Sequence, residues 1–170
     1  MCIRDRRKFT NAELQPALDD LRATKLTTFT DNFLRFNVMP GDIDWFDDFS
    51  AVTHNAQQAA RVAREGHAAG ILFDIEQYAQ PLFNYSKQRD AGTKSCDVYA
   101  AQARLRGREL MDAFQSAYPD LRVMMTFAYC LPLSATSDGT PMAKTDYALF
   151  AALIDGMLDA ARGNTHHRRL

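Results

Sequence analysis

Two carboxylates lie two positions apart in a short apolar segment, Gly70-Ile-Leu-Phe-Asp-Ile-Glu76. Side chains alternate between the two faces of a β-strand, so Asp74 and Glu76 are expected to share one face. Two carboxylates this close favour a shared proton, which leaves one of the two groups able to donate it. We therefore predict a catalytic pair, with Glu76 as general acid or base and Asp74 as the supporting carboxylate.

Polar side chains also alternate with apolar ones in an earlier segment, residues 32–39. Arg35 and Asn37 lie two positions apart and therefore on one face of this strand. We expect that face to be on the same side of the sheet as Asp74 and Glu76, and we expect the two residues to bind substrate. A simpler interpretation is an ion pair between Arg35 and Asp74 or Glu76 that only ties two strands together.

Three aromatic residues are further candidates for contact with substrate: Trp45, Tyr78 and Tyr129. The indole of Trp45 suits the flat face of a sugar, although the same side chain could instead anchor its loop against a helix. Tyr78 has the parity of Glu76 and could donate a hydrogen bond to it, and Tyr129 could line the pocket. The acids around Trp45 lack the spacing of a calcium loop, which favours a solvated loop: Asp42, Asp44, Asp47 and Asp48.

The elements that must position these residues alternate along the chain. Short segments rich in β-branched and aromatic residues predict strands at 32–39, 70–76 and 122–129, and apolar positions at helical spacing predict helices at 11–22, 55–65, 95–118 and 145–162. Strands separated by helices pair in parallel, and no glycine-rich nucleotide motif points to a doubly wound sheet. We therefore expect an α/β fold that is part of a TIM (β/α)8 barrel, with its site at the carboxyl ends of the strands.

The 70–76 segment resembles the strand motif of chitinase-like glycoside hydrolases of family 18, in which aspartates alternate with hydrophobic residues before a final glutamate. Gly70, Asp74 and Glu76 match that motif, whereas Ala69 and Leu72 stand where the family has aspartate. The resemblance implies that Glu76 is the proton donor and that Asp74 orients the substrate amide.

A longer stretch, about residues 30–161, is similar to uncharacterised barrel proteins of glycoside-hydrolase-like appearance. These carry Pro-Gly-x-x-Asp-Trp-Phe-Asp-Asp followed by Asp-x-Glu-x-Tyr, and the matching positions here are Pro40, Gly41, Asp44, Trp45, Phe46, Asp47, Asp48, Asp74, Glu76 and Tyr78. This resemblance implies the barrel fold and leaves the reaction open.

Composition narrows the choice of partner. The net charge is -1 over 170 residues, which favours a carbohydrate or another small molecule over nucleic acid. Cys2, Cys96 and Cys130 lack zinc spacing, so we expect free thiols, no metal and no cofactor. No apolar run reaches the roughly 20 residues of a membrane span.

Both ends of the chain look foreign to the domain. Met1-Cys-Ile-Arg-Asp-Arg6 resembles a translated adapter leader found in metagenomic reading frames, and the last residues are polar and basic where another strand is due. We expect a truncated chain with an artefactual or disordered leader at 1–10, a partial barrel domain at 11–163 and a disordered or artefactual tail at 164–170. Its location stays open: secreted or periplasmic for a polysaccharide hydrolase, otherwise cytoplasmic.

Three functions fit this sequence. The first is a glycoside-hydrolase-like barrel that uses Glu76 and Asp74 as acid/base and partner. The second is a metal-dependent lyase or phosphodiesterase barrel in which the same two carboxylates bind Mg²⁺. The third is a carbohydrate-binding pseudoenzyme that keeps the pair only for structure.

Overall fold

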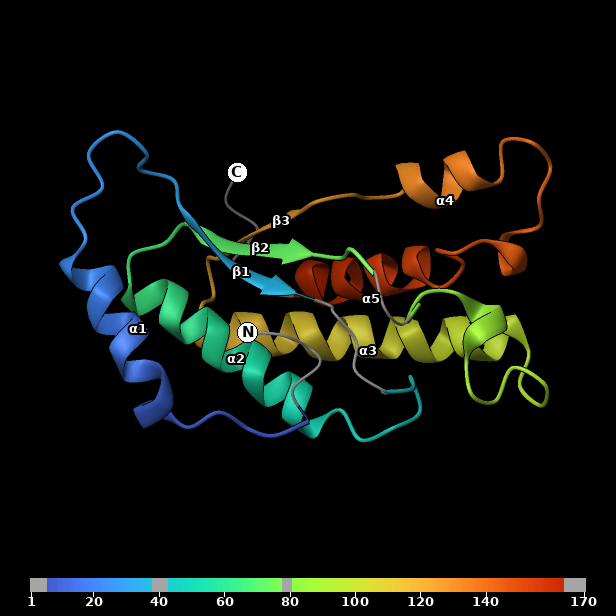
Figure 1. The fold of residues 1–170 in the computed structure, drawn as a ribbon, viewed down its shortest axis with the longest axis horizontal. Helices are drawn as coiled ribbons and strands as arrows, with labels where there is room; N and C mark the ends of the chain where they lie inside the picture. Colours follow the sequence, from blue (N-terminus) through green and yellow to red (C-terminus); the bar gives the residue numbers. More distant parts are fainter. Residues whose placement is uncertain (1–5, 38–42, 78–80, 164–170) are drawn as a thin grey trace.

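A computed structural model describes residues 6–37, 43–77 and 81–163 of the chain (Figure 1). Helices and strands alternate along it: α1 (Asn11–Ala23), β1 (Phe33–Asn37), α2 (Ser50–Glu65), β2 (Gly70–Asp74), η1 (Tyr85–Lys87), α3 (Cys96–Ala117), β3 (Arg122–Met125), α4 (Cys130–Ala135), η2 (Met142–Lys144) and α5 (Phe150–Gly163). No helix in these ranges is long and apolar enough to cross a membrane.

The three strands form one parallel sheet in the order β1-β2-β3. In the register of the sheet, Asn37 lies beside Asp74, and Leu72 lies between Arg35 and Met124. These pairings confirm the predicted α/β class and the parallel crossovers. The sheet is open, and the described part of the chain shows no barrel.

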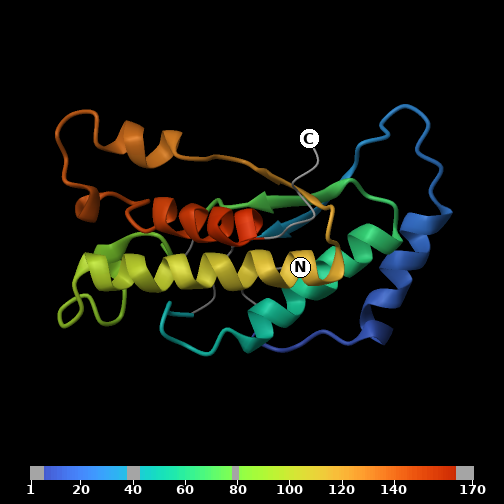
Figure 2. The same ribbon diagram turned by 180° about the vertical axis from the view of Figure 1, so that it is seen from behind.

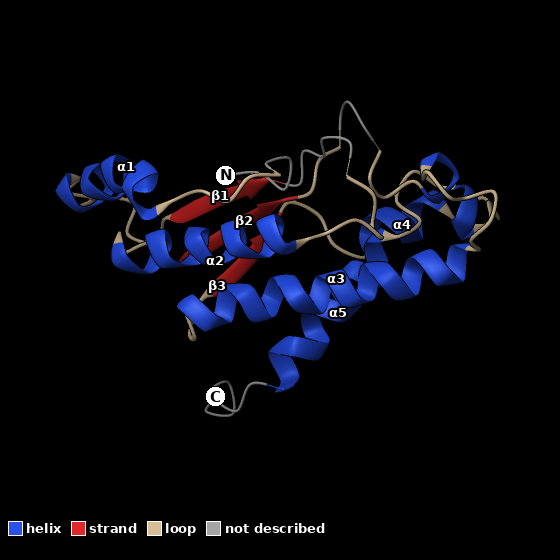
Figure 3. Cartoon of the chain, turned by 90° about the horizontal axis from the view of Figure 1, so that it is seen from below, coloured by secondary structure: helices blue, strands red, loops and turns tan. Residues whose placement is uncertain are grey.

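The helices α2, α3 and α5 lie together on one side of the sheet (Figure 3). Phe36 and Phe73 point into this layer, where their rings lie 5.4 and 6.3 Å from the ring of Phe114 on α3. The alternate positions point the other way, and there Arg35 and Met124 are exposed. The period of two therefore divides the strands into an aromatic face against the helices and a mixed face toward solvent.

Helices α3 and α5 lie side by side in both ribbon views (Figures 1 and 2). A glycine of each helix lies at the contact between them. A Cβ at Gly107 would overlap the carbonyl oxygen of Leu153, and a Cβ at Gly156 would overlap that of Arg104. The absence of a side chain at both positions is what lets the two helix backbones touch.

The first described residues lie against α2. Asn55 is fully buried, donates from Nδ2 to the carbonyl of Arg7 (2.9 Å) and accepts from the backbone N–H of Phe9 (3.0 Å). Thr10 then caps α1 through a capping box with Glu13. Residues 6–10, which the sequence assigned to a leader, therefore contact the folded domain, while residues 1–5 and 164–170 lie outside the described ranges.

Several predicted boundaries differ from the structure. The helix predicted at 55–65 begins five residues earlier, because α2 starts at Ser50, whose backbone N–H donates to Asp48 Oδ1 at 2.8 Å. The strands β2 and β3 end at Asp74 and Met125, before the expected 76 and 129. The short helix α4 lies between the predicted strand at 122–129 and the predicted helix at 145–162, where the sequence predicted neither a helix nor a strand.

Candidate functional site

One carboxylate oxygen at the end of β2 accepts hydrogen bonds from two side chains of β1. Arg35 donates from Nε to Asp74 Oδ2 at 2.7 Å and also from Nη2, and Asn37 donates from Nδ2 to the same oxygen at 3.1 Å. The other oxygen, Oδ1, accepts from the backbone N–H of Glu76 at 3.1 Å. Both oxygens of Asp74 are thus engaged, and the residue is only 4% exposed.

The strand register explains this convergence. Asn37 is the direct neighbour of Asp74, and Arg35 lies two residues before it on the same face. The guanidinium stays largely in solvent, with 61% of the Arg35 side chain exposed against 5% for Asp74. The structure therefore brings Arg35, Asn37 and Asp74 together on the face away from the helices, as the alternation of the sequence predicted.

Glu76 follows the end of β2 and is partly buried. Its neighbour Gln77 links this segment to the chain before α5, because its Nε2 donates to the carbonyl of Asp146 at 2.7 Å. Burial raises the pKa of Tyr147, and the negative charges of Glu76, Asp146 and Asp74 raise it further. The hydrogen bond of Gln77 therefore holds the end of β2 against the segment that precedes α5.

Gln77 and Tyr147 are members of this site that the sequence did not single out. Tyr147 fitted the apolar stripe of the predicted helix 145–162, so its spacing carried no separate signal. The helix begins only at Phe150, which leaves Tyr147 in the connecting segment. A contact across 69 residues, such as that of Gln77 with Asp146, has no signature in local pattern.

Trp45 lies in the core rather than over the site. Its indole is 1% exposed, and its Nε1 donates to the carbonyl of Leu82 at 2.8 Å. Phe49 stacks against the indole at 6.1 Å, and Phe83 lies 5.9 Å from it. A ring enclosed in this way offers no face to a sugar, so the structure supports the loop-anchor interpretation of Trp45.

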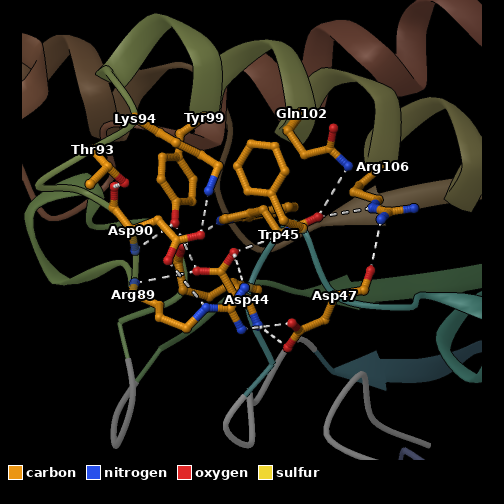
Figure 4. A network of polar contacts seen from close by, with 12 residues as sticks. Asp44, Trp45, Asp47, Arg89, Asp90, Thr93, Lys94, Tyr99, Gln102 and Arg106 are labelled. Atoms are coloured by element: carbon orange, nitrogen blue, oxygen red, sulfur yellow. Dashed lines mark hydrogen bonds and ion pairs between the residues drawn. The ribbon is translucent and has the colours of Figure 1, made fainter.

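The acids around Trp45 hold the same loop in place (Figure 4). Asp44 is 5% exposed and accepts from the Tyr99 hydroxyl at 3.0 Å and from the backbone N–H of Phe46 at 3.0 Å. Asp47 pairs with Arg89 at 2.8 Å. Burial raises the pKa of Tyr99 to about 12, and the hydrogen bond to Asp44 acts in the same direction.

Asp44 and Asp47 therefore have protein partners rather than the solvated setting expected from the sequence, whereas Asp48 is exposed as expected. Asp48 accepts from Ser50 at the start of α2, and Asp42 lies outside the described residues. Across residues 6–37, 43–77 and 81–163, no three potential ligands gather into a metal-binding group.

The two predicted tyrosines have different outcomes. Tyr129 lies beyond the end of β3 and donates its hydroxyl to Asp155 Oδ1 on α5 at 2.6 Å, which turns it toward a helix. The predicted contact of Tyr129 with substrate has no support in this geometry. Tyr78 lies outside the described residues.

No protein-family model, curated protein or solved structure matches this chain. A function for the chain therefore has to come from its own geometry.

Proposed function

We propose that the chain contributes three strands to a glycoside-hydrolase-like (β/α)8 barrel that acts on carbohydrate. In this proposal Glu76 is the general acid/base, and Asp74 is the supporting carboxylate. The observation that carries the proposal is the buried carboxylate of Asp74, held by Arg35 and Asn37 at the carboxyl ends of adjacent parallel strands. Active sites of α/β barrels lie at that end.

The two faces of the sheet support the barrel. Helices cover the face that carries Phe36 and Phe73, as the outer helix ring of a barrel does. The other face mixes the polar Arg35 with the apolar Leu72 and Met124. Further strands would bring this face inside, where apolar layers fill the barrel and the polar groups gather at its carboxyl end.

The hydrogen bonds of Asp74 support its role as a partner rather than as the acid. Three donor groups from Arg35, Asn37 and the backbone of Glu76 fix its two oxygens. Glu76 is thereby tied at its backbone to an anchored residue. In hydrolysis the Glu76 carboxyl gives its proton to the glycosidic oxygen as the bond to the anomeric carbon breaks. Water then adds its hydroxyl to the anomeric carbon, and its remaining proton restores the carboxyl that the enzyme started with.

The geometry gives less support to the metal-dependent alternative. A Mg²⁺ ion bound by Asp74 would have to displace the donors on its oxygens and would lie beside the positive charge of Arg35. The pseudoenzyme alternative uses the same contacts, with the ion pair of Arg35 and Asp74 joining β1 to β2. Turnover separates that alternative from the proposal.

The test is the turnover of glycosides by the intact barrel protein that contains these strands. Glu76→Gln keeps the shape of the side chain but cannot transfer a proton. It should lower turnover of an unactivated glycoside by roughly 10² to 10⁴-fold and leave binding nearly intact. A nitrophenyl glycoside needs less protonation of its leaving group, so its turnover should fall less. Glu65→Gln, at the far end of α2, is the matched control and should change neither rate.

Three outcomes would count against the proposal. Equal losses on both substrates would indicate that Glu76 orients the substrate or binds a metal, and inactivation by a chelator would favour the metal. Normal turnover by the Glu76→Gln variant would remove Glu76 from the mechanism. Sugar binding by the unaltered protein without any turnover would identify the pseudoenzyme.

A further inference from the structure

A pocket of about 440 Å³ opens between α4 and the segment that leads into α5. Its volume lies within the roughly 300–1,000 Å³ that small-molecule sites span. The wall combines hydroxyl, charged and apolar side chains: Leu131, Ser134, Ala135, Thr140, Lys144, Thr145, Asp146 and Tyr147.

This pocket adjoins the carboxylate site through Gln77. The side chain of Gln77, which follows Glu76 directly in the chain, donates to the carbonyl of Asp146 in the pocket wall at 2.7 Å. Tyr147 follows Asp146 in the chain and lines the same pocket. The wall of the pocket is therefore hydrogen-bonded to the residue that directly follows the proposed proton donor in the chain.

The polar groups of the wall suit an uncharged polyol. Asn84 donates from Nδ2 to Asp146 Oδ1 at 2.7 Å, which orients the carboxylate. Lys144 is exposed and forms no ion pair with any of the described residues. Sugar hydroxyls both donate and accept hydrogen bonds, so one can donate to Asp146 while another accepts from Lys144. The opposite charges of the two side chains cancel, which disfavours a strongly anionic ligand.

We propose that this pocket is the subsite for a neutral sugar ring of the substrate, with Lys144 and Asp146 as its specificity-determining residues. The identification of the ligand as the substrate rests on the proposed function. The partly buried ring of Tyr147 adds apolar surface for the face of the sugar.

The test measures the binding of trisaccharides to the 170-residue chain. The probes are maltotriose, cellotriose, xylotriose and chitotriose as uncharged sugars, with trigalacturonate as the acidic comparison. Of the uncharged probes, the one that binds most tightly is used for the comparison of variants. Lys144→Met and Asp146→Asn should each lower the affinity for this probe by about tenfold, equivalent to about 1.4 kcal/mol. Lys87→Met is the matched control, because Lys87 is an exposed lysine on η1 that is not part of the pocket wall, and it should leave affinity unchanged.

Kinetics of the intact protein give a second readout. Loss of Lys144 or Asp146 removes binding that the ground state and the transition state share, so KM should rise while kcat stays nearly constant. Glu76→Gln should instead lower kcat and leave KM nearly constant. An unchanged kcat in Glu76→Gln would therefore contradict the proposed function. An unchanged KM in the Lys144 and Asp146 variants would contradict the subsite.

The subsite inference is overturned if none of the uncharged trisaccharides binds the unaltered chain. Unchanged affinity in both the Lys144→Met and Asp146→Asn variants would also overturn it, provided that their thermal unfolding matches that of the unaltered chain. Tighter binding of trigalacturonate than of every uncharged probe would contradict the inference that the subsite takes a neutral sugar.

Discussion

Gly107 on α3 and Gly156 on α5 each face the backbone of the opposite helix. The missing side chain of Gly107 leaves room for the carbonyl of Leu153, and that of Gly156 leaves room for the carbonyl of Arg104. The approach is reciprocal, so the separation of the two helices depends on both residues. These helices follow β2 and β3 in the chain, and Phe114 of α3 packs against Phe73 of β2, the strand that carries Asp74.

Gly107→Ala should therefore destabilise the fold. The added methyl group meets a backbone atom that cannot rotate away, so α3 and α5 must separate, at a cost of about 1–3 kcal/mol in the free energy of unfolding. Gly92→Ala is the control, because nothing lies within 4 Å of a Cβ at that position. Urea unfolding measures both. Equal midpoints for the two variants would show that the helix contact is looser than described.

Two arginines on the same face of the sheet should differ in their contribution to stability. Arg35 donates to a carboxylate whose side chain is 5% exposed, whereas Arg122 pairs with Asp31, of which 65% is exposed. Arg35→Gln should cost about 1–2 kcal/mol, since Asp74 loses a charged donor while buried. Arg122→Gln should cost less than about 0.5 kcal/mol.

Chemical denaturation of the two variants at neutral pH measures this difference. Arg35→Lys is an informative third variant, because an ammonium group cannot donate from two nitrogens as the guanidinium does. We expect partial recovery of stability in Arg35→Lys. A loss in Arg122→Gln as large as that in Arg35→Gln would mean that burial of Asp74 does not decide the outcome.

The capping box of α1 should make stability depend on pH in the acid range. The backbone N–H of Thr10 donates to Glu13 at 2.8 Å and, with the Arg7 side chain, lowers the pKa of Glu13 from its ordinary 4.5 to about 2. A carboxylate with a lowered pKa stabilises the fold fully above pH 4.5, and this contribution is lost as the pH falls toward 2. Glu13→Gln should therefore lower Tm at pH 7 but not at pH 2, as measured by thermal unfolding. A constant difference in Tm across this range would contradict the assigned role.

Tyr99 should make the stability of the fold depend on pH in the alkaline range. Its folded pKa is raised from 10 to about 12, so its contribution is complete below pH 10 and is lost as the pH rises through 12. Tyr99→Phe should lower the free energy of unfolding by about 1–2 kcal/mol at neutral pH, because Asp44 loses a buried donor. Its ultraviolet titration should also lack a tyrosine that ionises near pH 12. Tyrosinate formation by Tyr99 near pH 10 in the folded chain would argue against this setting.

The parts of the site that depend on strand alternation could be predicted from the sequence. A period of two is fixed by the backbone, so Arg35, Asn37 and Asp74 fall on one face wherever the strand ends. The parallel order followed in the same way from the helices between the strands. Local periodicity was therefore enough to predict that these groups on adjacent strands would lie together.

The surroundings of Trp45 and Asn55 could not be predicted in this way. Trp45 meets Leu82 across 37 positions, and Asn55 meets Arg7 across 48. The local sequence around a tryptophan flanked by acids is the same whether the indole is exposed or covered. The local sequence around an asparagine at the start of a helical stripe is likewise the same whether its side chain is exposed or buried. Only the tertiary partners distinguish the two cases, and they leave no mark on local spacing.

The alignment of β1 with β2 has a consequence for folding. Arg35 and Asn37 reach Asp74 only when Asn37 stands beside it. A slip of one residue would turn Arg35 toward Phe114 and bring Phe36 out into water. The polar cluster on one face and the aromatic layer on the other therefore both make a one-residue shift of β1 against β2 unfavourable. The contacts of Asp74 with Arg35 and Asn37 form only in this register, which couples correct alignment of the two strands to assembly of the carboxylate site.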